Sequence, residues 1–229
     1  MTQTPASLGF SMPAEWTPHA ATWMGWPFND ENWEGYLEPA RADFTKLVRT
    51  IADYEPVHLT VNDQESLDDA KHRLGQTKHV LQNIHFRQAA IDDIWFRDSG
   101  PIFVQNQKGH TALTDWKFNV WGERFEWKKD ILVPKGVAQE LNMLRFEVPI
   151  IMEGGALDIN DRGVLLTTKQ CLLNKNRNPN FSQSQIEQYL KDYLGVKQIL
   201  WLENGLEGDK TDGHVDTITR FANDDTIIT

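Results

Sequence analysis

The order of predicted helices and strands is that of a mixed α/β fold, and local patterns along the chain support it. Residues 38–53 carry apolar side chains at helical spacing, which predicts an amphipathic helix. The run VHLTV at 57–61 predicts the strand that follows. A second helix is predicted at 183–194, with Ser182 as its N-cap and Gly195 as the residue that ends it.

The other elements are predicted from the same kinds of signal. Residues 1–22 are rich in Pro, Thr and Ala and are expected to be irregular. Pro27 is expected to end a short buried strand, because proline cannot donate a hydrogen bond within a sheet. In chain order we expect a strand at 21–27, a turn at Asn62–Asp63, a helix at 64–75, a strand at 83–88, a hairpin of 101–105 with 111–118, a helix at 135–144, a strand at 145–155, a hairpin of 156–159 with 163–168, a strand at 197–202 and a last strand in 224–229.

The composition indicates a globular protein and disfavours several classes of partner. The 229 residues are 40% hydrophobic and 24% charged, which is too apolar for disorder and sufficient for one domain spanning 1–229. The net charge of −10 argues against nucleic acid and is compatible with a cationic substrate. We find no leader pattern and no apolar run of about 20 residues, so no membrane partner is expected. The single cysteine, Cys171, fits a reducing compartment, which predicts a cytoplasmic protein.

Two corners of the chain carry carboxylates. Asp98 lies in the segment WFRDSGP, just before a Gly-Pro turn. On its own, such an Asp is more commonly a local hydrogen-bonding device. Glu153 ends an apolar strand and precedes Gly154 and Gly155, which allow backbone or a ligand to approach closely. A buried Glu153 would need a partner; a solvent-exposed Glu before a turn is the alternative.

The third corner is the segment DGHVDT. If this segment is a strand, the side chains of His214 and Asp216 point to the same side. An imidazole beside a carboxylate suits acid–base chemistry. A metal site or an ordinary ion pair is the alternative, although no third ligand is spaced convincingly and no helical His-Glu-x-x-His pattern occurs.

Taken together, five ordered segments resemble the agmatine deiminases, within the wider bacterial peptidyl-arginine-deiminase-like family. The segments are MPAEWTPHAATWMGWP (12–27), IWFRDSGPIFV (94–104), DWKFNVWG (115–122), EGGALDINDRGVLLTTKQCLLNKNRNP (153–179) and DGHVDTITRFA (212–222). The resemblance implies a pentein-type α/β propeller, in which five ββαβ-like modules surround a central site. About three of these modules fit into 229 residues, so the resemblance implies that C-terminal modules are missing.

The resemblance also implies a reaction, the hydrolysis of agmatine to N-carbamoylputrescine and ammonia on a route to putrescine. Asp98 and Asp216 would bind the nitrogens of the cationic guanidine, because carboxylates pair with such groups strongly and directionally. A cysteine thiolate would attack the central carbon, and His214 would protonate the departing ammonia and then activate water. Glu153 would orient His214 and favour its protonated form.

The resemblance also bears on the expected roles of Trp95, Trp121 and Cys171. Trp95 and Trp121 would line the substrate pocket, although isolated tryptophans are more commonly core residues. In the family the nucleophilic cysteine lies near the C-terminus, after a Gly-rich stretch that this sequence does not contain. Cys171 falls in a β-like apolar run and is expected to be buried filler rather than the nucleophile. We therefore expect a fragment of a longer enzyme, inactive by itself.

Other functions stay open. A non-catalytic module that binds a guanidinium or a polyamine would need the carboxylates but no thiol. A deiminase acting on arginine or peptidyl-arginine is the nearest enzymatic variant, and a metal-dependent hydrolase is a more distant one. The family reading requires no cofactor and no metal, and relatives imply a homodimer.

Overall fold

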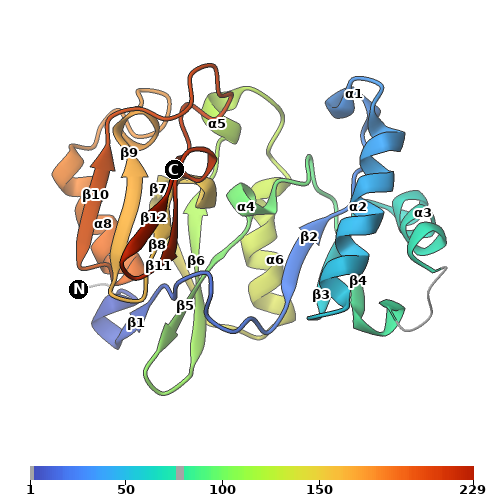
Figure 1. Cartoon of the computed structure of the whole chain (residues 1–229), viewed down its shortest axis with the longest axis horizontal. Helices are drawn as coiled ribbons and strands as arrows, with labels where there is room; N and C mark the ends of the chain where they lie inside the picture. Colours follow the sequence, from blue (N-terminus) through green and yellow to red (C-terminus); the bar gives the residue numbers. More distant parts are fainter. Residues whose placement is uncertain (1–2, 76–79) are drawn as a thin grey trace. The chain divides into compact units, whose positions relative to one another are not determined.

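A computed structural model describes residues 3–75 and 80–229 (Figure 1). The chain forms two compact units. Unit 1 comprises Met1–Thr17 and Arg97–Thr229, and unit 2 comprises Pro18–Phe96. All predicted site residues except Trp95 belong to unit 1. The assignment of residues 1–229 to one domain stays a prediction.

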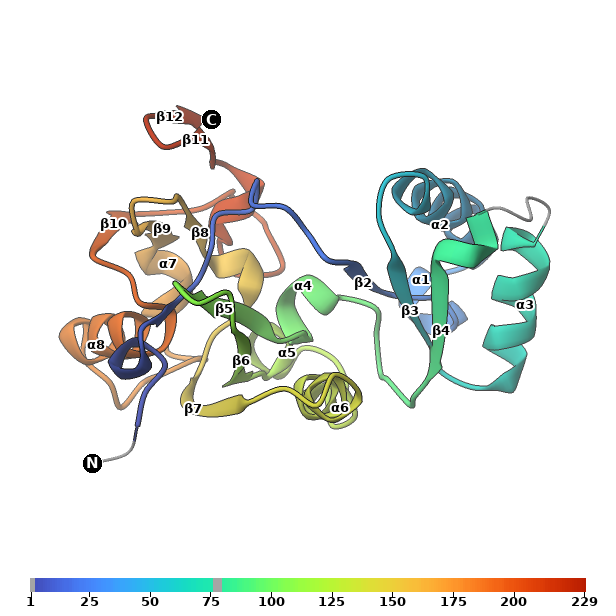
Figure 2. The same cartoon turned by 90° about the horizontal axis from the view of Figure 1, so that it is seen from below.

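Unit 2 is a three-stranded parallel sheet in the order β2-β3-β4, with two long helices on one face (Figure 2). Its elements are β2 (Thr22–Gly25), α1 (Asp30–Trp33), α2 (Leu37–Ala52), β3 (Val57–Val61), α3 (Gln64–Leu74), a 3-10 turn (Val80–Asn83) and β4 (Ile84–Gln88). The alternate residues Val57, Leu59 and Val61 of β3 are fully buried and form the core with α2 and α3. Helix α3 begins at Asp63, whose carboxylate accepts a hydrogen bond from the backbone N–H of Ser66 (2.8 Å).

Unit 1 contains two sheets and a separate hairpin. The sheets run in the orders β1-β5-β6-β7 and β10-β9-β8, and β11 pairs with β12. The strands are β1 (Phe10–Ser11), β5 (Ile102–Asn106), β6 (Thr111–Lys117), β7 (Arg145–Ile151), β8 (Asp158–Ile159), β9 (Val164–Thr168), β10 (Gln198–Leu202), β11 (Arg220–Asn223) and β12 (Thr226–Ile228). The helices are α4 (Phe96–Ser99), α5 (Val120–Glu123), α6 (Val133–Glu140), α7 (Lys169–Leu172) and α8 (Gln183–Leu194), and 3-10 turns occur at Ala6–Leu8, Asp130–Leu132, Gly154–Ala156 and Val215–Thr217.

Helix α8 shows how the sequence builds the core of unit 1. Ile186, Leu190 and Leu194 follow one another at intervals of one helical turn, and all three are fully buried in the same cluster as the inner residues of β7. The hydroxyl of Ser182 accepts a hydrogen bond at the start of the helix, and Gly195 ends it with a φ of 67°. The helix therefore has the bounds and the caps that the sequence predicted.

Most other predicted elements are present, but the strand predicted at 145–155 ends at Ile151 and the helix predicted at 135–144 lies at Val133–Glu140. The segment 1–22, expected to be irregular, has short regular pieces in a 3-10 turn, β1 and the start of β2, and its residues 1 and 2 lie outside the described part of the chain. Two further predictions are wrong. His214 and Asp216 lie at the 3-10 turn Val215–Thr217 instead of in a strand. Cys171 lies in the short helix α7 instead of in a β-like run, because the Thr168 hydroxyl caps a helix there.

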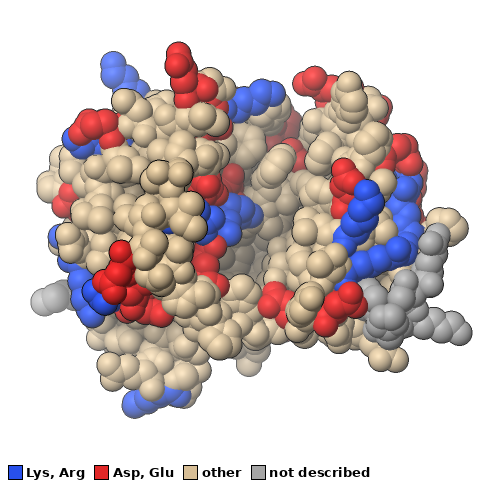
Figure 3. Space-filling view, viewed as in Figure 1, with Lys and Arg blue, Asp and Glu red and all other residues tan. Residues whose placement is uncertain are grey.

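The surface shows no concentration of one charge on the face that Figure 3 displays. Within the described residues, acidic and basic side chains are interspersed on this face of each unit. Two of the predicted site carboxylates are buried instead, since Asp98 and Glu153 are 8% and 0% exposed. None of the helices in residues 3–75 and 80–229 is both long and apolar enough to cross a membrane.

Candidate active site

Asp98 lies in helix α4, and its side chain is buried. The backbone N–H of Gly155 donates to Oδ1 (3.0 Å), and the indole N–H of Trp121 donates to Oδ2 (3.0 Å). Burial raises the pKa of Asp98 and the charge of His214 lowers it, which leaves the pKa at about 6. A cation close to this carboxylate would favour its ionised form.

Gly155 is the residue around which the site converges. A Cβ atom built on it would lie within 3.0 Å of Oδ1 of Asp98, Nδ1 of His214 and Oδ2 of Asp216. Only glycine fits at this position, because the two carboxylates and the imidazole pack where a Cβ atom would be. The structure brings Asp98, His214 and Asp216 together here from distant parts of the sequence, and their roles stay predictions.

The loop before His214 explains why the predicted strand does not form. The carboxylate of Asp209 accepts hydrogen bonds from the backbone N–H groups of Gly213 (3.1 Å) and His214 (3.3 Å). Gly213 has a φ of 91°, a backbone conformation that residues other than glycine rarely adopt. These contacts curl the chain into the 3-10 turn Val215–Thr217. The turn, rather than strand alternation, directs His214 and Asp216 toward Gly155.

His214 is buried among carboxylates. Its Nδ1 lies 3.7 Å from Oδ1 of Asp98, and its Nε2 lies 3.8 Å from Oε2 of Glu153. Nε2 is buried and makes no hydrogen bond with the described residues. Burial lowers the pKa of His214, but Glu153, Asp98 and Asp216 outweigh this effect, so the pKa is raised. His214 therefore holds its proton more readily than an ordinary histidine, as a general acid must.

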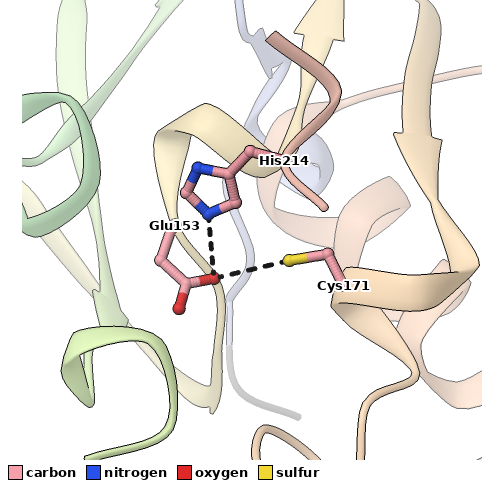
Figure 4. Close-up of side chains that lie close together, drawn as sticks. All are labelled: Glu153, Cys171 and His214. Atoms are coloured by element: carbon pink, nitrogen blue, oxygen red, sulfur yellow. Dashed lines mark hydrogen bonds and ion pairs between the residues drawn. The ribbon is translucent and has the colours of Figure 1, made fainter. Parts of the chain in front are cut away.

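The carboxylate of Glu153 lies between the imidazole of His214 and the thiol of Cys171 (Figure 4). Its side chain is fully buried. Its Oε2 faces Nε2 of His214 and lies 3.9 Å from Sγ of Cys171. Its Oε1 accepts a hydrogen bond from Nε of Arg177 (2.6 Å), and both side chains of this ion pair are inaccessible to solvent. The alternative of a solvent-exposed Glu153 is therefore wrong, and the carboxylate has the partners that its burial requires.

Cys171 is the only thiol of the chain, and its surroundings oppose reactivity. The side chain is fully buried. Burial raises the pKa of the thiol well above its ordinary value, and the carboxylate of Glu153 raises it further. A thiol that stays protonated and lacks contact with solvent is a poor nucleophile, because the thiolate is the reactive form.

Glu153, Cys171 and His214 offer three donor atoms within 4.8 Å of one another, a set that could hold a metal ion. The chemistry of the donors suits zinc. The guanidinium of Arg177 opposes this use, because it already neutralises the carboxylate of Glu153 at 2.6 Å. The imidazole of His214 and the thiol of Cys171 each face Oε2 of Glu153 at 3.8 and 3.9 Å.

The two predicted tryptophans differ in their surroundings. Trp121 is buried and donates to Asp98, so it supports the carboxylate directly. Its φ of 59° lies in the left-handed region, which is costly for a side chain of this size. Trp95 is 46% exposed, belongs to unit 2 and donates to Oδ2 of Asp93 (3.1 Å). The expectation that Trp95 lines the pocket stays a prediction.

Asp216 lies in a region of balanced charge. Burial raises the pKa of Asp216; His214, Arg97 and Arg220 lower it, and the net pKa is raised. The carboxylate of Glu15 bonds both Arg97 and Arg220, which ties the N-terminal segment to the chain on both sides of the site. The two arginines are thus paired with Glu15, and Arg220 also lies 3.3 Å from Oδ1 of Asp158.

Sequence reasoning missed two groups that shape the site. Arg177 and Glu15 both lie in segments that carried the family resemblance, NKNRNP and MPAEWTP, but neither was assigned a role. An arginine between asparagines in a non-helical segment was the available signal for Arg177. Nothing in one sequence signals that Glu15 pairs with residues 82 and 205 positions away.

Comparison with known proteins places the site in context. The model of the Porphyromonas-type peptidyl-arginine deiminase family matches residues 11–229. Agmatine deiminase of Pseudomonas aeruginosa (strain LESB58) is 42% identical over 94% of this chain and 58% of its own length. The solved agmatine deiminase of Enterococcus faecalis superposes with a TM-score of 0.91 at 33% identity, over 99% of this chain and 62% of that one.

A third relative was solved with its substrate. This Cys-to-Ser variant of a C. jejuni agmatine deiminase has a TM-score of 0.85 and 32% identity, and the match covers 95% of this chain and 63% of that one. These matches confirm the predicted pentein-type α/β fold. The chain spans less than two thirds of the length of each of the three relatives.

Proposed function

Because the chain belongs to the Porphyromonas-type peptidyl-arginine deiminase family, we propose that it supplies the guanidinium-binding and acid–base part of an agmatine deiminase. The names of its relatives support agmatine as the substrate. Agmatine carries a planar guanidinium cation, which pairs strongly with carboxylates. The activity of the whole protein, including the step that needs a thiolate, is part of this proposal.

The observation that carries the proposal is the convergence at Gly155. Oδ1 of Asp98 and Oδ2 of Asp216 both border the space beside its Cα, and Nδ1 of His214 borders the same space. Two carboxylates can accept the N–H groups of one guanidinium, while the imidazole faces a departing nitrogen. A burial-raised pKa at Asp98 and Asp216 means that the empty site resists negative charge, which a bound cation relieves.

Each residue then has a defined part in the reaction. A thiolate forms a C–S bond to the guanidinium carbon, and the C–N bond to one terminal nitrogen breaks. Nδ1 of His214 gives a proton to that nitrogen, which leaves as ammonia. His214 next removes a proton from water, whose oxygen attacks the amidino carbon and releases the thiolate and N-carbamoylputrescine. Glu153 faces Nε2 and favours the protonated imidazole.

The thiolate is assigned to a residue outside these 229. Cys171 is fully buried and its pKa is raised well above the ordinary value, which supports this assignment. The C. jejuni relative solved with substrate is a Cys-to-Ser variant, which is consistent with a cysteine acting in that enzyme. A homodimer, a cytoplasmic location and independence from cofactors stay predictions.

A second function is favoured by the state of Cys171. A chain without a reactive thiol can still bind a guanidinium, so a non-catalytic guanidinium or polyamine binder is the competing proposal. Arginine and peptidyl-arginine remain alternative substrates, because the residues assigned here would bind the guanidinium group that all three compounds share.

Ammonia release separates these proposals. Agmatine is supplied to the 229-residue chain and to a protein extended to the length of its relatives. We expect ammonia from the extended protein alone. Release by the 229-residue chain, abolished by Cys171→Ser, would overturn the assignment of the nucleophile. No release by a folded extended protein that binds agmatine would favour the non-catalytic binder.

A further inference from the structure

Arg177 is the most completely bonded side chain near the site, and it is inaccessible to solvent. Its Nε donates to Oε1 of Glu153 (2.6 Å). Nη1 donates to Oδ2 of Asp212 (3.0 Å) and to Oδ1 of Asn176 (2.7 Å), and Nη2 donates to the carbonyl oxygen of Thr211 (2.9 Å). One guanidinium therefore joins Glu153 to the segment that leads into His214.

We propose that Arg177 is a positioning residue that fixes Glu153 against Nε2 of His214. This inference rests on the proposed function for its catalytic meaning, while its structural content stands on the contacts themselves. Thr211 and Asp212 come just before Gly213 and His214. The Nη1 and Nη2 atoms of Arg177, which bind these two residues, therefore help to position the imidazole of His214. The Nε atom of Arg177 positions the carboxylate of Glu153.

The geometry of Glu153 shows why such an anchor is needed. Its Oε2 lies 3.8 Å from Nε2 of His214 and 3.9 Å from Sγ of Cys171, both beyond a strong hydrogen bond (Figure 4). Neither contact can hold the carboxylate in place. The bond of 2.6 Å from Arg177 to Oε1 is the short one, and it leaves Oε2 directed at the imidazole. Without it, the carboxylate can turn about its last side-chain torsion.

An arginine suits this position and a lysine does not. The guanidinium is planar and presents its donors in a fixed fork, so it can bind Glu153, Asp212 and a carbonyl oxygen at once. A lysine ammonium carries the same charge on one nitrogen and cannot reach both ends. Arg177→Lys therefore keeps the buried positive charge and removes the geometry. This separation of charge from position makes it the informative substitution.

The test follows the imidazole of His214 by NMR titration in the 229-residue chain, with His214→Asn to assign its signal. We expect Arg177→Lys to lower the pKa of His214, because Glu153 no longer holds its place. Agmatine affinity should change by less than about threefold, since the fork does not touch Asp98 or Asp216. In the protein extended to the length of its relatives, if it releases ammonia, Arg177→Lys should lower kcat by roughly a hundredfold and leave KM little changed.

Three controls sharpen the result. Arg124→Lys alters another arginine that binds Asp212, but none of its described contacts involves Glu153, so the titration of His214 should not move. In the background of Glu153→Gln, Arg177→Lys should lower the pKa no further, because the two residues act through one contact. Arg177→Gln removes the charge as well. Loss of charge alone would raise the pKa of His214, whereas loss of position lowers it.

A wild-type or raised pKa of His214 in folded Arg177→Lys would overturn the proposal. A full effect of Arg177→Lys in the Glu153→Gln background would also contradict it. The NMR readout needs no turnover, so it stands even if no ammonia is released. Conversely, ammonia release with an unmoved titration would leave the proposed function standing and remove the role of Arg177.

Discussion

The two units of the molecule differ in what they bury. In the described part of unit 2, the buried residues are apolar or small except for the hydroxyl groups of Thr60 and Ser66. Unit 1 buries the titratable side chains of Asp98, Asp130, Glu153, Asp158, Arg177 and His214. Buried charge costs free energy unless it is paired and hydrogen-bonded. Unit 2 is therefore built for packing, and unit 1 accepts a cost in stability where we propose that chemistry occurs.

The largest expected effect comes from a matched pair of carboxylates, one in each unit. Asp98 accepts from the indole of Trp121 at 3.0 Å, and Asp69 of unit 2 accepts from the indole of Trp26 at the same distance. Asp98→Asn should weaken agmatine binding by at least about 30-fold, because it removes one charge of a buried ion pair with the substrate. Asp69→Asn should leave it within about twofold. Calorimetric titration checks both, and equal losses would break the comparison.

A matched pair of glycines gives the next effect. A Cβ on Gly155 would meet the three site side chains, and a Cβ on Gly25 of unit 2 would lie 2.9 Å from the Cα of Ile94. Both substitutions to Ala should lower the free energy of unfolding by about 1–3 kcal/mol through overpacking. Gly155→Ala should also weaken agmatine binding by roughly tenfold to a hundredfold, because its methyl group would displace the three side chains that we propose bind the guanidinium. Thermal unfolding and calorimetry together distinguish them; unchanged agmatine binding in Gly155→Ala would contradict the site.

The pH dependence of binding tests the charge state of Asp98. Its folded-state pKa is raised to about 6, so the carboxyl group is mostly protonated at pH 5 and mostly ionised at pH 7. Agmatine affinity should fall roughly tenfold from pH 7 to pH 5. Protonation of His214, whose pKa is also raised, acts in the same direction.

The effect of Asp98 on folding stability has the opposite pH dependence to its effect on agmatine affinity. The folded chain binds the Asp98 proton more tightly than the unfolded chain, so this group lowers stability as the pH rises from about 4 to about 6. Asp98→Asn should weaken the pH dependence of agmatine affinity, leaving the part that comes from His214, and should remove the contribution of Asp98 to the pH dependence of stability. Calorimetry and denaturant titrations across this range can measure both. Agmatine affinity that rises toward pH 5 would contradict the assignment.

The smallest effect on binding is expected from the core of unit 2. Leu59 is fully buried in β3, so Leu59→Ala should lower the free energy of unfolding by about 2–5 kcal/mol. Agmatine affinity, measured below the unfolding transition, should change by less than about twofold. Leu190→Ala in α8 is the matched substitution in unit 1. A large loss of affinity in Leu59→Ala would mean that the chemistry is not confined to unit 1.

Local chemistry was sufficient to predict much of the fold. Helix α8 has its predicted bounds because Ser182 and Gly195 determine its ends within the segment itself. Strand β3 was predicted correctly because VHLTV carries its own apolar pattern. Local patterns singled out Asp98, Glu153, His214 and Asp216 as candidates, the family resemblance gave them their expected roles, and the structure brings their side chains together.

Long-range contacts account for what the sequence could not predict. The turn at His214 depends on Asp209, which accepts from backbone groups four and five residues later, and no periodicity reports such a loop. The interaction of Arg177 with Glu153 joins positions 24 residues apart. Cys171 lies beside Glu153 because α7 replaces the expected strand. In each case a side chain bonds to a partner outside the local pattern.

The most direct test of the central claim compares two ligands that differ in the guanidinium. Agmatine and putrescine share a four-carbon diamine-like chain, but putrescine has an amine where agmatine has the guanidinium. The account predicts that the 229-residue chain binds agmatine at least about tenfold more tightly than putrescine at pH 7, because two carboxylates at Gly155 accept paired N–H donors. Equal affinity for the two, or no binding of agmatine by the folded chain, would contradict it.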